Sequence, residues 1–85
     1  MRVKILYFAS LREALGCSEE VLEALPPGVS SVGALRDWLC ARGGDWAALA
    51  PGKAVRAAVN QTLAQPHSPI AEGDEVAFFP PVTGG

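Results

Sequence analysis

The sequence predicts an α+β fold in which one main helix covers one face of a small mixed β-sheet. Three segments alternate apolar and polar residues with the period of a half-buried strand, and they span residues 2–9, 54–60 and 75–79. A fourth segment, residues 32–42, repeats its apolar residues at helical spacing. Since one helix covers only one face of such a sheet, we expect the second face to be open.

The whole chain, residues 1–85, is expected to form a single domain, because it has the length of one small core and no linker or repeat divides it. The net charge is −2 and lysines and arginines do not cluster, which argues against nucleic-acid binding. No apolar run is long enough to cross a bilayer. We therefore expect a cytoplasmic protein with no membrane partner.

The first strand and a short helix open the chain. In residues 2–9, one alternate set of side chains is expected to face the core, and the other set faces outward and ends at Phe8. Ser10 and Glu13 have the spacing of a capping box, which predicts a short helix over residues 11–15.

A second strand is expected from Glu20 to Leu25, followed by a turn at Pro26-Pro27-Gly28. The main helix, residues 32–42, is expected to be capped by Ser31 and to bury one apolar stripe, with Arg36 pointing away from it. That stripe consists of Val32, Leu35, Trp38 and Leu39.

The second half of the chain predicts three more strands. Residues 54–60 form the third strand, Asn60-Gln61 a tight turn, and residues 62–63 a short fourth strand. Residues 75–79 form the last strand, which the following prolines end.

The C-terminal stretch is expected to leave the domain as a flexible extended tail over residues 80–85. Pro80 and Pro81 end the last strand, because each lacks a backbone donor, and adjacent prolines favour an extended exit. Gly84 and Gly85 place no side chain beside the terminal carboxylate, so the tail is thin enough for a narrow tunnel. The carboxylate of Gly85 is then the reactive group. The alternative is a frayed terminus without a role.

Three outward apolar side chains, Phe8, Leu63 and Phe79, fall on the open face of the sheet. Clustered exposed apolar groups are typical of a surface that a partner covers. We expect such a partner-binding surface here, with Arg12 as a charged contact at its rim. The alternative is that Phe8 and Phe79 only pack on each other across neighbouring strands.

No pattern in the sequence predicts an independent active site or a metal site. Cys17 and Cys40 are too far apart for a CxxC motif, and the single histidine, His67, cannot complete a zinc site with them. Two free thiols and a solvated loop histidine are expected instead.

Several segments together carry a family resemblance. They are Ala57-Ala58-Val59-Asn60-Gln61, then Glu72-Gly73-Asp74-Glu75-Val76-Ala77-Phe78-Phe79-Pro80-Pro81-Val82-Thr83-Gly84-Gly85, and at the start Val3-Lys4-Ile5-Leu6-Tyr7-Phe8-Ala9 with Leu11-Arg12-Glu13. With these residues the chain resembles the small subunit of molybdopterin synthase. The resemblance implies a β-grasp, ubiquitin-like fold and a sulfur carrier, the non-catalytic sulfur-donor subunit of a sulfurtransferase whose catalytic groups lie on the large subunit.

The same resemblance implies a series of reactions at Gly85. An E1-like enzyme uses ATP to form a transient C-terminal adenylate, and sulfur from a sulfur-donating enzyme replaces AMP to give a thiocarboxylate. The thiocarboxylate then donates its sulfur to a cyclic pyranopterin phosphate, which forms the dithiolene that holds molybdenum. The resemblance also implies no stably bound cofactor and a heterotetramer in which the tail enters the large subunit; the inserted residues would be Pro80, Pro81, Val82, Thr83 and Gly84.

Two alternative functions stay open at this point. A sulfur carrier for another pathway, such as thiamine thiazole synthesis, shares the fold and the Gly-Gly ending, although the run Phe78-Phe79-Pro80-Pro81-Val82-Thr83 argues against it. A ubiquitin-like modifier joined to lysines, or a binding module with an inert tail, would also carry these features.

Overall fold

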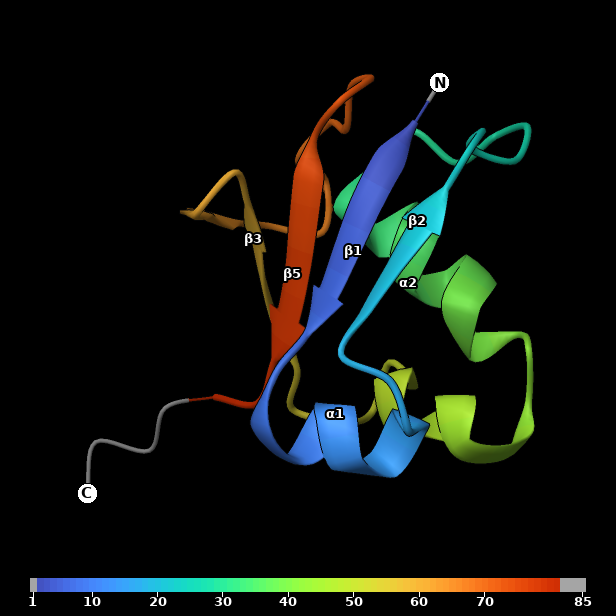
Figure 1. Ribbon diagram of the computed structural model, residues 1–85, viewed down its shortest axis with the longest axis vertical. Coiled ribbons are helices and arrows are strands. Elements are labelled where there is room, and N and C mark those ends of the chain that lie inside the picture. Colours follow the sequence, from blue (N-terminus) through green and yellow to red (C-terminus); the bar gives the residue numbers. More distant parts are fainter. Residues whose placement is uncertain (1, 82–85) are drawn as a thin grey trace.

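The computed structural model describes residues 2–81, which form one five-stranded mixed sheet with a helix packed behind it (Figure 1). The elements in chain order are β1 (Val3–Tyr7), α1 (Ala9–Leu15), β2 (Glu19–Leu22), α2 (Val32–Cys40), the 3-10 helix η1 (Gly44–Leu49), β3 (Arg56–Val59), β4 (Thr62–Ala64) and β5 (Glu75–Phe79). The strand order is β2-β1-β5-β3-β4. Only β1 and β5 are parallel among these pairs, and this is the predicted α+β, β-grasp arrangement.

The core lies between the sheet and α2, and its side chains come from the alternate positions that the sequence predicts. The fully or nearly buried residues are Val3, Ile5, Tyr7, Leu11, Val32, Leu35, Leu39, Leu49, Ala57, Ile70, Val76 and Phe78. Trp38 packs at the margin of this cluster. No polar or charged residue is buried within the described part of the chain. Residues 2–81 also contain no helix with the length and apolar character needed to span a bilayer.

Helix α1 starts two residues earlier than predicted, and the capping box is wrong. Phe8 is the N-cap and makes no side-chain capping bond, while Ser10 lies inside the helix. The reason is the sheet: the backbone N–H of Phe8 donates to the carbonyl of Phe78 (3.1 Å), so the extended backbone continues past β1 to Phe8 and the helix follows at once. Gly16 ends the helix with φ 73°, a left-handed conformation that suits glycine.

Strand β2 is shorter than the predicted Glu20–Leu25 segment and starts one residue earlier. It pairs antiparallel with β1, and the pairing ends where Val3 lies opposite Leu22. Because β1 begins at Val3, the chain beyond Leu22 has no partner in the sheet. The predicted turn at Pro26-Pro27-Gly28 is confirmed, with the N–H of Val29 donating to the carbonyl of Pro26 (3.1 Å).

Helix α2 starts as predicted but ends two residues early. The Oγ of Ser31 accepts a hydrogen bond from the N–H of Ala34 (3.2 Å), which is the expected N-cap. The helix ends at Cys40, since the N–H of Arg42 reaches back only three residues, to the carbonyl of Leu39 (3.1 Å). The last turn is therefore tightened.

Arg36 was expected to face away from the apolar stripe of α2, and it does not pack in the core, but its side chain is bound by other parts of the fold instead of extending into solvent. Its guanidinium donates to the carbonyls of Leu49 (2.7 Å), Ala50 (2.6 Å) and Lys53 (2.8 Å). Arg36 therefore holds the end of η1 and the residues that follow it against α2.

The second half of the chain agrees closely with the prediction. Strand β3 occupies the middle of the expected 54–60 segment, and β5 has the expected bounds. Asn60 and Gln61 have φ 50° and 69°, the pair of left-handed residues that a two-residue hairpin turn requires. Strand β4 follows directly and extends one residue further than expected.

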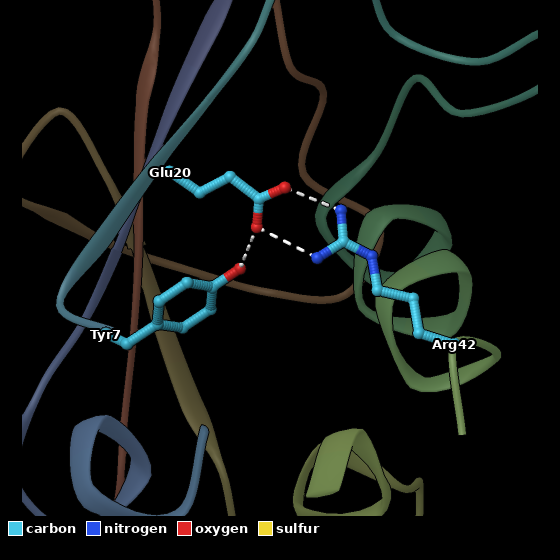
Figure 2. A network of polar contacts seen from close by, with 3 residues as sticks. All are labelled: Tyr7, Glu20 and Arg42. Carbon is cyan, nitrogen blue, oxygen red and sulfur yellow. Dashed lines mark hydrogen bonds and ion pairs between the residues drawn. The ribbon is translucent and has the colours of Figure 1, made fainter. Parts of the chain in front are cut away.

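A polar cluster that the sequence did not reveal joins β1, β2 and the residues after α2 (Figure 2). The hydroxyl of Tyr7 donates to Oε1 of Glu20 (3.2 Å), and the guanidinium of Arg42 donates to both carboxylate oxygens (3.0 and 2.6 Å). The same guanidinium lies over the rings of Trp38 and Trp46, 4.9 and 4.5 Å from their centroids. The cluster thus ties the edge strand β2 to the helical side of the fold.

The contacts of this cluster shift the pKa values of all three side chains, and the hydrogen bonds to Glu20 raise that of Arg42. Hydrogen bonds from Arg42 lower the pKa of Glu20 below its ordinary value of 4.5. Burial, and then the nearby charge of Glu20, raises the pKa of the Tyr7 hydroxyl. At neutral pH the cluster therefore holds a neutral phenol, a carboxylate and a guanidinium.

We expect Glu20→Gln to lower the free energy of unfolding by about 1–2 kcal/mol at pH 7, because the hydrogen bonds lose their charged acceptor. A carboxylate with a lowered folded pKa stabilises the fold above its unfolded pKa, and this contribution disappears as pH falls through the folded pKa. The difference between parent and variant should therefore shrink below about pH 4.5. Urea denaturation at a series of pH values measures this, with Glu13→Gln on the exposed side of α1 as the control. A difference that does not change with pH would contradict the charge argument.

Candidate functional site

The sheet face opposite α2 carries a continuous set of apolar side chains, which we call the outer patch. Its members are Leu6, Phe8, Ala58, Leu63, Ala77 and Phe79. Register places one row of them across four strands: Leu6 is paired with Ala77, Ala77 with Ala58, and Ala58 with Leu63. In Figure 1 the helix α2 lies behind the sheet, so this face points toward the viewer.

Phe8 and Phe79 lie side by side at the end of the sheet where the chain exits. Tyr7 is paired with Phe78, and the N–H of Phe8 donates to the Phe78 carbonyl (3.1 Å), so the next position brings Phe8 beside Phe79. Phe8 is 46% exposed and Phe79 is half-buried. The predicted adjacency of these two positions follows from the parallel pairing of β1 and β5.

Leu63 extends the patch toward the far edge of the sheet. It is 68% exposed, and only the small side chains of Ala58 and Ala77 separate it from Leu6 in the row. A large apolar group with that exposure gains little from the domain's own core, but it would gain about 25 cal/mol per Å² if a partner covered it. Its place on the outer face agrees with the prediction.

Two exposed arginines flank the point where the tail begins. Arg12 lies on α1 one turn after Phe8, and its N–H approaches the Phe8 carbonyl (3.4 Å). Arg56 is in register with Phe79 on the neighbouring strand β3, which places its side chain on the same face. In the alternation of residues 54–60 Arg56 occupies an outward position, but its place beside Phe79 depends on a strand order that a single sequence does not reveal.

The other end of the outer face carries exposed ion pairs, with Val21, opposite Lys4, as its one exposed large apolar side chain within residues 2–81. Lys4 pairs with Glu19 (3.7 Å) and Arg2 with Glu23 (4.0 Å). Such solvated pairs contribute little to stability. The apolar part of this face is therefore concentrated toward the end where the tail begins.

The tail begins at the corner of the outer patch. Phe79 is the last paired residue of β5, and Pro80 and Pro81 follow it without joining a strand. The remaining predicted tail residues, Val82, Thr83, Gly84 and Gly85, lie outside the described residues.

Within residues 2–81, no group of three or more His, Cys, Asp or Glu residues could hold a metal ion. Cys17 and Cys40 are half-buried free thiols, and His67 is exposed in the loop before Ser68. What the described residues bring together is an apolar face, two flanking cations and the origin of an extended arm. This arrangement suits docking and delivery.

These features define a small β-grasp protein with an exposed apolar face next to the point where β5 ends. A family model described as "ThiS family" matches residues 5–85, and the chain belongs to this family.

The similar proteins include sulfur carrier subunits and a small archaeal modifier protein. The chain is 49% identical, over 98% of its length and 99% of the relative's, to the molybdopterin synthase sulfur carrier subunit of Escherichia coli (strain K12). Among solved structures it resembles a putative molybdopterin converting factor, subunit 1, from Pyrococcus furiosus, with TM-score 0.76, 30% identity, and 96% and 99% of the two chains covered. It also resembles the small archaeal modifier protein 1 of H. volcanii, with TM-score 0.72, 27% identity, and 95% and 98% covered.

We expect the outer patch to contribute little to folding. Leu63→Ala should change the free energy of unfolding by less than about 0.5 kcal/mol, because Leu63 is 68% exposed. Leu35→Ala, the matched change at a leucine with 0% exposure, should cost about 2–5 kcal/mol. Urea denaturation of the two variants makes the comparison. Equal losses would mean that Leu63 is a structural residue.

Proposed function

We propose that this chain is the cytoplasmic sulfur carrier subunit of a molybdopterin synthase. The observation that carries the proposal is the 49% identity to the E. coli sulfur carrier subunit, which extends over 98% of this chain. The fold supports it, since the same β-grasp arrangement occurs in the P. furiosus protein at 30% identity.

The proposed chemistry takes place at the carboxylate of Gly85. A carboxylate oxygen attacks the α-phosphorus of ATP in an adenylating enzyme, which releases pyrophosphate and leaves an acyl-adenylate. Hydrosulfide supplied by a sulfur-donating enzyme then attacks the carbonyl carbon and displaces AMP, and loss of the S–H proton leaves a C-terminal thiocarboxylate. On the large subunit the thiocarboxylate sulfur attacks a carbon of a cyclic pyranopterin phosphate, and water hydrolyses the resulting thioester, which leaves the sulfur on the pterin and restores the carboxylate of Gly85.

The features of this chain indicate which part of the reaction it contributes and which parts its partners contribute. A thiocarboxylate is a good nucleophile that needs orientation and exclusion of water, and a large subunit that encloses the tail supplies both. The tail is narrow because Pro80 and Pro81 hold it extended and Gly84 and Gly85 carry no side chains. Catalytic groups for each step come from the partners.

The outer patch would seat the carrier on the large subunit. Phe8, Phe79 and Leu63 form an aromatic-rich apolar centre, and Arg12 provides a charged contact at the rim, which is the composition of a typical interface. Because β5 runs from the patch directly into Pro80, docking this face also aims the tail.

A ubiquitin-like modifier is the second candidate, and the likeness to the small archaeal modifier protein 1 favours it. Both functions start from the same C-terminal adenylate and differ in the acceptor, which is sulfur for the carrier and a lysine amine for the modifier. The identity to that modifier is 27%, against 49% for the sulfur carrier subunit. We therefore prefer the carrier.

The proposal predicts that removing Gly85 abolishes sulfur transfer. The shortened chain would end at Gly84, one residue short, so its carboxylate would not reach the catalytic groups of the partner enzymes. A reconstituted assay with adenylating enzyme, sulfur donor and large subunit should show no thiocarboxylate and no dithiolene product, while circular dichroism shows an intact fold. Turnover by the shortened chain at the parent rate would refute the role of Gly85.

Phe79→Ala should weaken binding to the large subunit by about 30-fold, or roughly 2 kcal/mol, as expected of an aromatic residue at an interface centre. Titration calorimetry measures the affinity, and urea denaturation measures the smaller expected loss of stability. Val21→Ala is the matched control, because Val21 is a 37% exposed residue on the edge strand β2, away from the tail. Unchanged affinity with a large stability loss would make Phe79 a structural residue.

A further inference from the structure

A hollow of about 470 Å³ opens between α2 and the β3–β4 hairpin, at the edge of the sheet farthest from β2. Much of its lining is apolar and comes from Val32, Val55, Ala57, Ala64 and Pro66. The hairpin with β3 stands at one side of the sheet in Figure 1. This hollow lies between the sheet and the helix, so it is distinct from the outer patch, although Leu63 and Arg56, at the edge of the sheet, border both.

Strand β4 presents a free backbone edge beside this hollow. The N–H of Asn60 donates to the carbonyl of Glu75 (2.8 Å), so the even-numbered positions of the β3 segment direct their backbone groups toward β5. The backbone groups of Ala57 and Val59 therefore point toward β4. In an antiparallel ladder, hydrogen-bonded pairs alternate with pairs that share no hydrogen bond. The pair of Ala58 with Leu63 is of the second kind, so the N–H and C=O of Leu63 point away from the sheet.

Within the described residues no strand pairs with that edge of β4. An unpaired edge is a template for an added strand. A peptide paired with Leu63 would place one side chain on Leu63 itself, and the side chains before and after it would point to the opposite face, toward the hollow. The site therefore fits a short apolar run in extended conformation.

The charges around the hollow indicate what flanks that run. Arg36, Arg56 and Asp37 all line it. Among residues 2–81 neither arginine forms an ion pair with a carboxylate, since the pairs there involve Arg2, Lys4 and Arg42. The rim thus has one excess positive charge on a protein whose net charge is −2. An acidic segment complements this rim, whereas a second copy paired symmetrically would bring the arginines of two rims together.

We propose that the hollow and the free edge of β4 form a second protein-binding site, which takes an extended segment of a partner with three apolar residues between acidic flanks. The segment adds as a sixth strand beside β4. Its backbone forms hydrogen bonds with the N–H and C=O of Leu63, and its acidic flanks lie near Arg56. This inference does not depend on the proposed function, because none of its groups takes part in the chemistry of the tail; Leu63 is the residue that it shares with the outer patch.

The test uses the full-length ¹⁵N-labelled protein and the synthetic peptide acetyl-Asp-Glu-Val-Leu-Val-Glu-Asp-amide. We expect saturable NMR shifts at the amides of Val32, Leu63 and Ala64, together with slowed hydrogen exchange at Leu63. Two control peptides separate the contributions. Replacing the central leucine by proline removes a backbone donor and should abolish saturation, and replacing the four acidic residues by lysine should do the same.

Charge variants of the rim test the orientation. Asp37→Asn should tighten peptide binding and Arg56→Gln should weaken it, each by about threefold. Arg2→Gln is the control, because Arg2 lies at the opposite end of the sheet beside Glu23, and it should leave the affinity unchanged.

Three results would overturn the proposal. The first is the absence of saturable shifts at millimolar peptide, and the second is shifts confined to Phe8 and Phe79, which would assign the peptide to the outer patch. The third is concentration-dependent dimerisation in sedimentation, with the same shifts at Leu63 in the absence of peptide, which would make a second copy the occupant.

Discussion

The parallel pairing of β1 with β5 is the constraint on which the rest of this structure depends. It joins the two ends of the chain at the centre of the sheet and stacks Tyr7 on Phe78 in the core, with ring centroids 6.4 Å apart. One position further, it brings Phe8 beside Phe79 on the outer face and ends β5 where the tail begins. The sharp change from strand to helix after Phe8 gives Ala9 a φ of 53°, which costs about 1 kcal/mol or more. The pairing compensates for this cost.

The two faces of the sheet have different roles: the inner face forms the core, and the outer face exposes apolar side chains. Every strand side chain in the core comes from the inner face, and a domain of this size has few apolar groups to spare for its own stability. Phe8 and Leu63 nevertheless remain 46% and 68% exposed. Their exposure is explained if the carrier must associate with and release several partners, because a partner can cover the patch only while the tail is engaged.

Local sequence patterns predicted most of the fold, and the errors occur where tertiary contacts determine the bounds of an element or the partners of a side chain. Alternation alone located β1 and β5, and the Ser31 cap and the Asn60-Gln61 turn depend only on near neighbours in the sequence. The predicted start of α1 was wrong and the hydrogen bonds of Arg36 were not predicted, because both are determined by carbonyls of residues far along the chain.

In the candidate site, too, local features could be predicted and tertiary contacts could not. The outward positions of Phe8 and Phe79 follow from the alternation of apolar and polar residues along each strand, so the apolar face could be predicted. Their adjacency needed the strand order, which the β-grasp resemblance supplied. The position of Arg56 beside Phe79 and the cluster of Tyr7, Glu20 and Arg42 carry no such signal, because their partners are distant in sequence.

The most direct test of the central claim is the intact mass of the protein purified from its native cells, with fragmentation of its C-terminal peptide. The carrier function predicts a fraction in which one sulfur has replaced one oxygen, located at Gly85 and lost when the purified protein reacts with the large subunit and its pterin substrate. An unmodified mass in cells that are making molybdopterin would contradict it. So would larger species in which Gly85 is joined to lysine side chains of other proteins.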